Sequence, residues 1–216
     1  MSGSTALAEL TRTHRDGFVD TLEGLAPEEW DVPSLCAGWR VVDVAAHLAW
    51  APVLGAASGA ATLARHGFSV NRMIARSAVG WSARGRDAIL DQLRANVRSG
   101  ATPVGMPPVA ALADAVVHGL DVRRPLGLPG QVPAAALAPL AEFTLGTPWP
   151  MNVVVGGSAR RRVAGVRLVA TDADWTHGTG PEVRATAEDL LLLLYGRRVE
   201  AGRLSGPGAA TLLARL

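Results

Sequence analysis

Apolar residues recur at helical spacing through the N-terminal part of this chain. They predict helices over residues 5–25, 41–65, 71–99 with an interruption near 80–85, 109–123, and 133–145. A kink is expected in the second helix at Pro52 and Gly55, and Asp43 falls in its first turn, where a carboxylate meets free backbone amides. The helices from 5 to 123, joined by modest loops, predict a four-helix bundle.

The pattern changes after residue 147. Residues 160–175 alternate and are rich in β-branched side chains, which predicts one or two strands. A helix follows, with Thr186 and Asp189 as a capping box, and a short last helix ends the chain. We therefore predict a mainly α protein, in which a helical bundle over residues 1–147 precedes a small α/β domain over 148–216.

The predicted fourth helix carries Asp114, His118 and Asp121 within an otherwise apolar run. Their spacing of four and three places these side chains on one face, about a turn apart. Apolar residues take most of the remaining circumference, so the helix should be buried and its charged groups need partners. Mutual hydrogen bonds, an arginine such as Arg123 or Arg124, or a divalent metal ion would each satisfy them.

A metal site in a bundle needs at least one more ligand from another helix. His47 lies inside the second predicted helix, in apolar surroundings, and should seek a partner on a neighbouring helix. A histidine whose hydrogen bonds are satisfied within the core fits this position as well. His14 and His66 are interpreted as structural or solvated, and His177 is a loop residue whose role stays open.

The composition excludes several kinds of catalytic and metal site. The 216 residues are 49% apolar, enough for a core, and the single cysteine, Cys36, excludes an internal disulfide and a cysteine-only metal site. We interpret Cys36 as a small buried hydrophobe. All 21 basic residues are arginine, which excludes a Walker-type phosphate loop and a lysine Schiff base and suggests a GC-rich bacterial genome.

The charge and the apolar runs predict where the protein works. The net charge of +2 is too small to indicate a nucleic-acid partner. The N-terminus carries charges where a signal peptide needs an apolar core, and the longest uncharged run falls short of a bilayer span. We therefore expect a cytoplasmic protein without a membrane partner, either a monomer or a homodimer.

Two stretches, EEWDVPSLCAGWRVVDVAAHL and DAVVHGLDVRRPLG, resemble the mycothiol-dependent maleylpyruvate isomerase family, and its actinobacterial members in particular. This family belongs to the DinB-like superfamily of metal-binding four-helix bundles. Its N-terminal signature is matched by Trp30, Pro33, Ser34, Gly38, Trp39, Asp43, His47 and Leu48. The C-terminal stretch GVRLVATDADWTHGTGPEVRATAEDLLLLLYGR extends the resemblance over nearly the whole chain.

The resemblance implies a divalent metal, most often zinc, held by His47, Asp114 and His118. The best-described relatives have glutamate where this chain has Asp114, so the shorter side chain would draw the helix closer or bind through one oxygen. Asp121 then supports a ligating histidine by accepting its other N–H, or it lies at the surface or pairs with an arginine.

The resemblance also implies a mycothiol-using metalloenzyme that acts on a small electrophile, as a cis–trans isomerase or a thiol S-transferase. The family's C-terminal domain supplies an active-site arginine, which maps to Arg197, whereas Arg123 and Arg124 bind substrate carboxylates or cap the helix. The part after residue 147 looks short for a complete domain of this kind. The alternatives are a metalloenzyme of specialised metabolism that does not use mycothiol, and a non-catalytic DinB-like binding or stress module.

Overall fold

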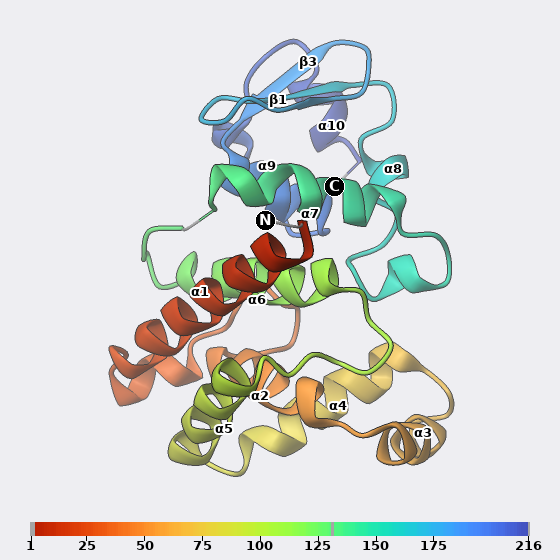
Figure 1. Cartoon of the computed structure of the whole chain (residues 1–216). Helices are drawn as coiled ribbons and strands as arrows, with labels where there is room; N and C mark the ends of the chain where they lie inside the picture. The colour runs from red at the N-terminus through yellow and green to blue at the C-terminus, as the bar shows by residue number, and fades with distance from the viewer. Residues whose placement is uncertain (1–2, 131, 216) are drawn as a thin grey trace. The chain divides into compact units, whose positions relative to one another are not determined.

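The computed structural model describes residues 3–130 and 132–215, and its chain divides into two units, Met1–Pro129 and Gly130–Leu216 (Figure 1). The first unit is helical. Its elements are α1 (Gly3–Glu23), the 3-10 turn η1 (Pro27–Asp31), α2 (Val41–Trp50), the 3-10 turn η2 (Ala51–Val53), α3 (Ala56–Arg65), α4 (Val70–Ser82), α5 (Arg86–Ser99) and α6 (Pro108–Arg123).

Helices α1, α2, α5 and α6 pack around one another as the expected bundle, and α1 runs along α6 (Figure 1). Their shared core is apolar and includes Phe18, Leu22, Val44, Ile89 and Val122. Helix α6 is buried on nearly every side, as its sequence predicted, because small and aliphatic residues surround its polar stripe. The bundle therefore places the stripe inside the protein.

The second predicted helix is broken where a kink was expected. Helix α2 ends at Trp50, η2 follows, and α3 starts only at Ala56. Pro52 has no N–H to continue an α-helix, and Gly55 is in an extended conformation as the N-cap of α3. The predicted interruption of the third helix is confirmed: Gly85, with a φ of 88°, separates α4 from α5, and α4 packs against α2.

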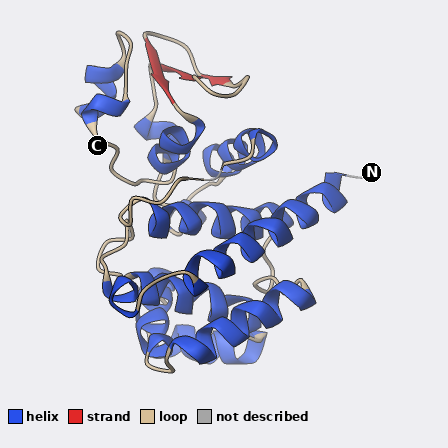
Figure 2. Ribbon diagram, turned by 90° about the vertical axis from the view of Figure 1, so that its left-hand side faces the viewer, coloured by secondary structure: helices blue, strands red, loops and turns tan. Residues whose placement is uncertain are grey.

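The second unit combines helices with a small sheet, drawn in red in Figure 2. Its elements are α7 (Ala134–Gly146), η3 (Met151–Val153), α8 (Ala159–Arg162), β1 (Arg167–Ala170), β2 (Thr176–His177), β3 (Glu182–Ala185), α9 (Ala187–Leu194), η4 (Ala201–Arg203) and α10 (Ala209–Leu213). The strand order is β2-β1-β3, with β1 antiparallel to β2 and parallel to β3. The predicted class, mainly α with a small α/β part at the C-terminal end, is confirmed.

The boundary between the units differs from the expected division near residue 147. Helix α7 packs against α8 and α9, so it belongs with the sheet and not with the bundle. The Tyr195 hydroxyl also donates to the carbonyl of Leu140 in α7, at 3.0 Å. The sequence analysis grouped α7 with the preceding helices because it relied on helical periodicity. Periodicity shows that a helix has an apolar face but not which other element packs against that face.

In the second unit, one local prediction is confirmed and others are wrong. Thr186 caps α9 by accepting a hydrogen bond from the backbone of Asp189, as expected. The arginine triplet at 160–162 lies in α8 and not in a strand, and β3 was not predicted. Among the described residues, no helix has both the length and the apolar character needed to cross a bilayer.

Asp43 fixes the start of α2, the helix that carries His47. Its buried carboxylate accepts a hydrogen bond from the backbone N–H of Arg40 at 3.0 Å and another from the Arg40 guanidinium at 3.1 Å. Burial disfavours the ionised form, but the hydrogen bonds from Arg40 outweigh it, so the pKa of Asp43 is lowered. The expected role of Asp43 in the first turn is confirmed.

Asp43→Asn should lower the free energy of unfolding by about 1–2 kcal/mol at pH 7, because the amide keeps the size of the side chain and loses its charge. The folded-state pKa lies below the unfolded-state value of about 3.9. The contribution of the charge is therefore complete above that value and disappears as the pH falls through the folded-state pKa. Urea unfolding at pH 7 and at low pH measures both effects.

The control for Asp43→Asn is Asp31→Asn, since Asp31 also pairs with Arg40 but has a side chain that is 66% exposed. This control should change the free energy of unfolding little. A penalty for Asp43→Asn that is equal at both pH values would show that the charge is not its cause.

Candidate metal centre

Helices α2 and α6 bring three of the sequence-predicted ligands together. His47 comes from α2, and Asp114 and His118 come from successive turns of α6. One ligand atom from each of these side chains lies within 4.8 Å of the other two. Two imidazoles and a carboxylate are a donor set that zinc accepts, and three protein ligands leave a coordination position open for catalysis.

His47 has a ring nitrogen that needs a partner. The side chain is buried, and among the described residues its Nδ1 is the buried polar atom without a hydrogen bond. Burial, together with the charge of His118, lowers the pKa of His47 to about 3, so the ring is neutral at pH 7. A neutral imidazole with an unused buried nitrogen fits the requirement of a metal ion.

Asp121 supports His118 from inside α6. Its side chain is fully buried, and His118 Nδ1 lies 2.8 Å from Asp121 Oδ2. Burial lowers the pKa of His118, but interactions with Cys36 and Asp121 outweigh it and raise the pKa to about 10. At pH 7 both ring nitrogens of His118 therefore carry protons, and a metal ion would have to displace the proton of Nε2 while Nδ1–H stays shared with Asp121.

Cys36 is the residue that sequence reasoning missed. Its Sγ lies 3.0 Å from Asp121 Oδ2 and 3.6 Å from His118 Nδ1, so the thiol contacts polar groups, although the side chain also packs against the apolar core. Cys36, His118 and Asp121 form a second group whose ligand atoms converge within 4.8 Å. The available signal was the position of Cys36 between Ser34 and Gly38, two residues of the family signature.

Aromatic rings pack around the two histidines. The Trp39 ring lies 5.4 Å from the His47 ring and 6.3 Å from the His118 ring, measured between centroids. The two imidazoles meet edge to face, with centroids 5.1 Å apart. Trp39 therefore helps to exclude water from the cluster and limits how the rings can rotate.

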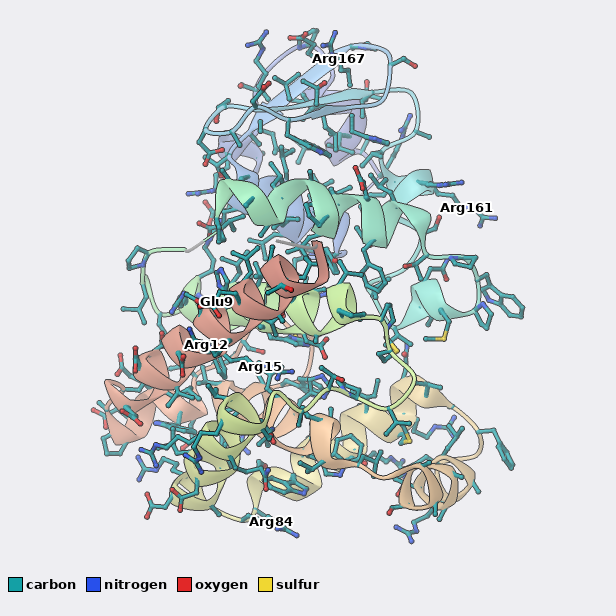
Figure 3. The ribbon with its side chains drawn as sticks, viewed as in Figure 1. Glu9, Arg12, Arg15, Arg84, Arg161 and Arg167 are labelled. Carbon is teal, nitrogen blue, oxygen red and sulfur yellow. The ribbon has the colours of Figure 1, made fainter. Side chains whose placement is uncertain are left out.

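A small pocket lies among side chains of α1, α2, α5 and α6. It is lined by Arg15 and Asn96 and otherwise by apolar side chains, among them Leu48 and Ala115. Arg15, which Figure 3 labels on α1, donates to the carbonyl of Ala101 at 2.7 Å. Burial lowers its pKa and the charge of Asp114 opposes that shift, so Arg15 contributes positive charge close to Asp114. The sequence analysis did not single out Arg15.

The three arginines considered for the site differ in their surroundings. Arg123 is buried, and its guanidinium donates to the carbonyl of Gly17 at 2.7 Å and to the hydroxyl of Thr21 at 2.7 and 3.1 Å. This side chain joins α6 to α1. Arg124 occupies the C-cap of α6. Arg197 lies in the second unit, half-buried, and donates to the carbonyl of Tyr195 at 2.6 Å.

The remaining histidines lie outside both convergent groups of the described residues. His14 is half-buried on α1, and burial followed by the charge of Arg123 lowers its pKa. His66 is the C-cap of α3. His177 is exposed on β2 and stacks with Trp175, their ring centroids 6.1 Å apart. The expected structural or solvated surroundings of His14 and His66 agree with these positions.

The sequence matches one family model. Residues 11–104 match the mycothiol maleylpyruvate isomerase N-terminal domain, a segment that contains Cys36 and His47 and ends before α6. The expected resemblance to this family is thereby confirmed over these residues. No curated protein sequence matches the chain.

Two solved structures share the fold. One is a mycothiol-dependent maleylpyruvate isomerase, at 13% identity and a TM-score of 0.65, with 96% of this chain and 94% of that chain covered. The other is a mutant of such an isomerase with a histidine replaced by alanine, at 12% identity, a TM-score of 0.64 and the same coverage. The C-terminal part is therefore not short for this fold; it looked short because it was counted from residue 147 and not from 130.

The position of Arg123 gives a prediction about stability. Arg123→Met keeps an apolar stem but removes the donors to Gly17 and Thr21, so it should lower the free energy of unfolding by about 2–4 kcal/mol. Metal content should stay at the wild-type value, since the guanidinium bonds to α1. Arg98→Met, at an exposed position of α5, is the control and should change stability by less than about 0.5 kcal/mol. Urea unfolding and elemental analysis test both statements; loss of metal from a folded Arg123→Met protein would refute the structural role.

Proposed function

We propose, from the match of residues 11–104 to the mycothiol maleylpyruvate isomerase N-terminal domain, that the protein is a divalent-metal-dependent enzyme that uses a thiol cosubstrate. The observation that carries the proposal is the convergence of His47, Asp114 and His118, together with the unused buried nitrogen of His47. Zinc is the proposed metal, because two imidazoles and one carboxylate suit it. Mycothiol is the proposed thiol, because the matching family is named for it.

Each residue of the proposed centre would contribute differently to binding the metal ion. His47 contributes a neutral imidazole, Asp114 contributes negative charge, and Asp121 keeps the Nδ1 proton of His118 directed away from the ligand position. A divalent ion bound by these residues would lower the pKa of an incoming thiol, so that it enters as a thiolate at neutral pH. Trp39 limits access of water to the same residues.

The proposed reaction is addition of the thiolate to an activated double bond. In the isomerase form, the sulfur bonds to one alkene carbon and the electron pair moves onto the conjugated carbonyl. The former C–C double bond, now single, then rotates; the enolate re-forms the double bond as the C–S bond breaks, and the sulfur leaves with that bonding pair as the thiolate. In the S-transferase form, the C–S bond is kept and the enolate takes up a proton, which gives a thioether.

Arg197 is proposed as the residue that pairs with a substrate carboxylate or a developing enolate. It follows Gly196, whose φ of 80° turns the chain after α9. Burial, followed by the charge of Arg197, lowers the pKa of half-buried Arg162. A guanidinium can bind a carboxylate through two hydrogen bonds. Arg124 remains a second candidate for the same contact.

Metal content is the first test of this proposal. Protein purified without chelators should hold about one equivalent of divalent metal, and His47→Ala or His118→Ala should lose most of it because two ligands cannot retain the ion. Asp114→Glu should retain it, because the carboxylate stays. His66→Ala is the matched control and should bind metal as the wild type does. Metal-free wild-type protein that also fails to take up added zinc would refute the centre.

Thiol chemistry is the second test. Zinc-loaded protein should bind mycothiol and should catalyse its addition to, or isomerisation of, a small cis-alkene conjugated to a carbonyl. His118→Ala should lower kcat/KM at least about 100-fold, because the thiol then loses its activation. Arg197→Met should lower turnover while metal content stays unchanged, and His66→Ala should match the wild type. Metal binding without any thiol binding would favour the metalloenzyme that does not use mycothiol.

A further inference from the structure

The segment from Pro33 to Arg40 is a closed loop that holds Cys36 in place. An antiparallel bridge joins its two ends, Pro33 and Arg40. Inside the loop, the Ser34 hydroxyl accepts from the N–H of Cys36 at 3.1 Å and donates to the carbonyl of Trp39 at 2.9 Å. Gly38, with a φ of +80°, lets the chain turn back. The thiol of Cys36 is therefore presented by a fixed backbone.

This loop is bonded to α6 at Asp121 through both its main chain and a side chain. The N–H of Leu35 donates to the backbone carbonyl of Asp121 at 3.0 Å. The thiol of Cys36 donates to Asp121 Oδ2, also at 3.0 Å. One residue of α6 is thus held through its main chain and through its side chain by two successive residues of the loop.

Asp121 needs these donors because its side chain is fully buried. A buried carboxylate is costly unless donors surround it. Its Oδ2 receives both Cys36 and Nδ1 of His118, so the position of the thiol affects where the carboxylate can meet the imidazole. This chain of contacts runs from the loop, through Asp121, to a residue of the candidate metal centre.

We propose that Cys36 is a positioning residue for the metal centre: its thiol orients the Asp121 carboxylate, which holds His118 with Nδ1–H inward and leaves Nε2 for the metal. The inference rests on the proposed function, because it assigns His118 as a ligand. Residues behind metal ligands commonly change metal affinity by about 10- to 100-fold. Cys36 does so here without touching the ion.

Direct ligation by Cys36 is the competing arrangement, since Cys36, His118 and Asp121 also converge. Two observations favour the supporting role. The unused buried nitrogen belongs to His47, which is in the other convergent group. The carboxylate of Asp121 already has donors at 2.8 and 3.0 Å, whereas His47 Nδ1 has none among the described residues.

Zinc affinity, measured on metal-stripped full-length protein by competition with a chromophoric chelator, tests the proposal. Cys36→Val removes the donor and keeps the volume, so it should weaken zinc binding roughly 10- to 100-fold. Cys36→Ser keeps a donor and should recover most of the affinity. The double variant Cys36→Val/Asp121→Asn should bind zinc no more weakly than Asp121→Asn alone, because Cys36 acts through Asp121.

A spectroscopic measurement separates support from ligation. In ¹⁵N-histidine spectra of the zinc-loaded wild type, His118 should show a protonated Nδ1 and a metal-bound Nε2, and Cys36→Val should speed the exchange of the Nδ1 proton. Cobalt-loaded wild type should lack a thiolate-to-cobalt charge-transfer band. A band that disappears in Cys36→Ser would overturn the proposal, because Cys36 would then be a ligand.

The remaining outcomes are decisive in the same way. Equal zinc affinity of wild type and Cys36→Val would overturn the role of Cys36 and leave the metal centre intact. Additive losses from Cys36→Val and Asp121→Asn would overturn the path through Asp121. Wild-type protein that takes up no zinc would overturn the centre itself. Should Cys36→Val fail to fold by circular dichroism, Cys36→Ala and the spectra of Cys36→Ser provide the same comparison.

Discussion

The bundle depends on satisfying polar side chains that its apolar helices bury. Asp121 has no exposed surface and His47 very little, so neither can rely on water for hydrogen bonds. Asp121 finds donors in His118 and Cys36, whereas His47 Nδ1 finds none among the described residues. This imbalance leaves a buried ring nitrogen of His47 without a partner in the group that it forms with Asp114 and His118.

The spacing of residues on α6 explains how this helix can supply both His118, a proposed metal ligand, and Asp121, which bonds to it. On α6, Asp114 lies four residues before His118 and Asp121 lies three residues after it, so the histidine is between two carboxylates along one face. Asp121 bonds to Nδ1 of His118, and His118 also converges with His47 and Asp114. In the proposed centre, Nε2 would be the nitrogen that binds the metal.

Much of this arrangement could be predicted from the sequence. Periodicity located α1, α5 and α6, and the stripe on α6 followed from spacing alone, because both depend on residues close in the chain. Three features depended on distant contacts: α7 joins the second unit because it packs on α9, Arg123 bonds to α1, and Cys36 faces Asp121. A lone cysteine in a loop looks the same in the sequence whether its side chain fills space or donates a hydrogen bond. Only the fold could distinguish these two roles.

Asp114 occupies a position where the resemblance implies glutamate, and its shorter side chain can be considered together with its surroundings. A shorter carboxylate reaches less far from the α6 backbone, so it depends more on the distance between α6 and α2. That distance is restrained by the loop from Pro33 to Arg40, which leads directly into α2 and is bonded to α6 at Asp121. Arg15 adds positive charge near Asp114. The loop that contacts His118 through Asp121 therefore also limits how far α2 and α6 can separate, and so how far the shorter side chain of Asp114 has to reach.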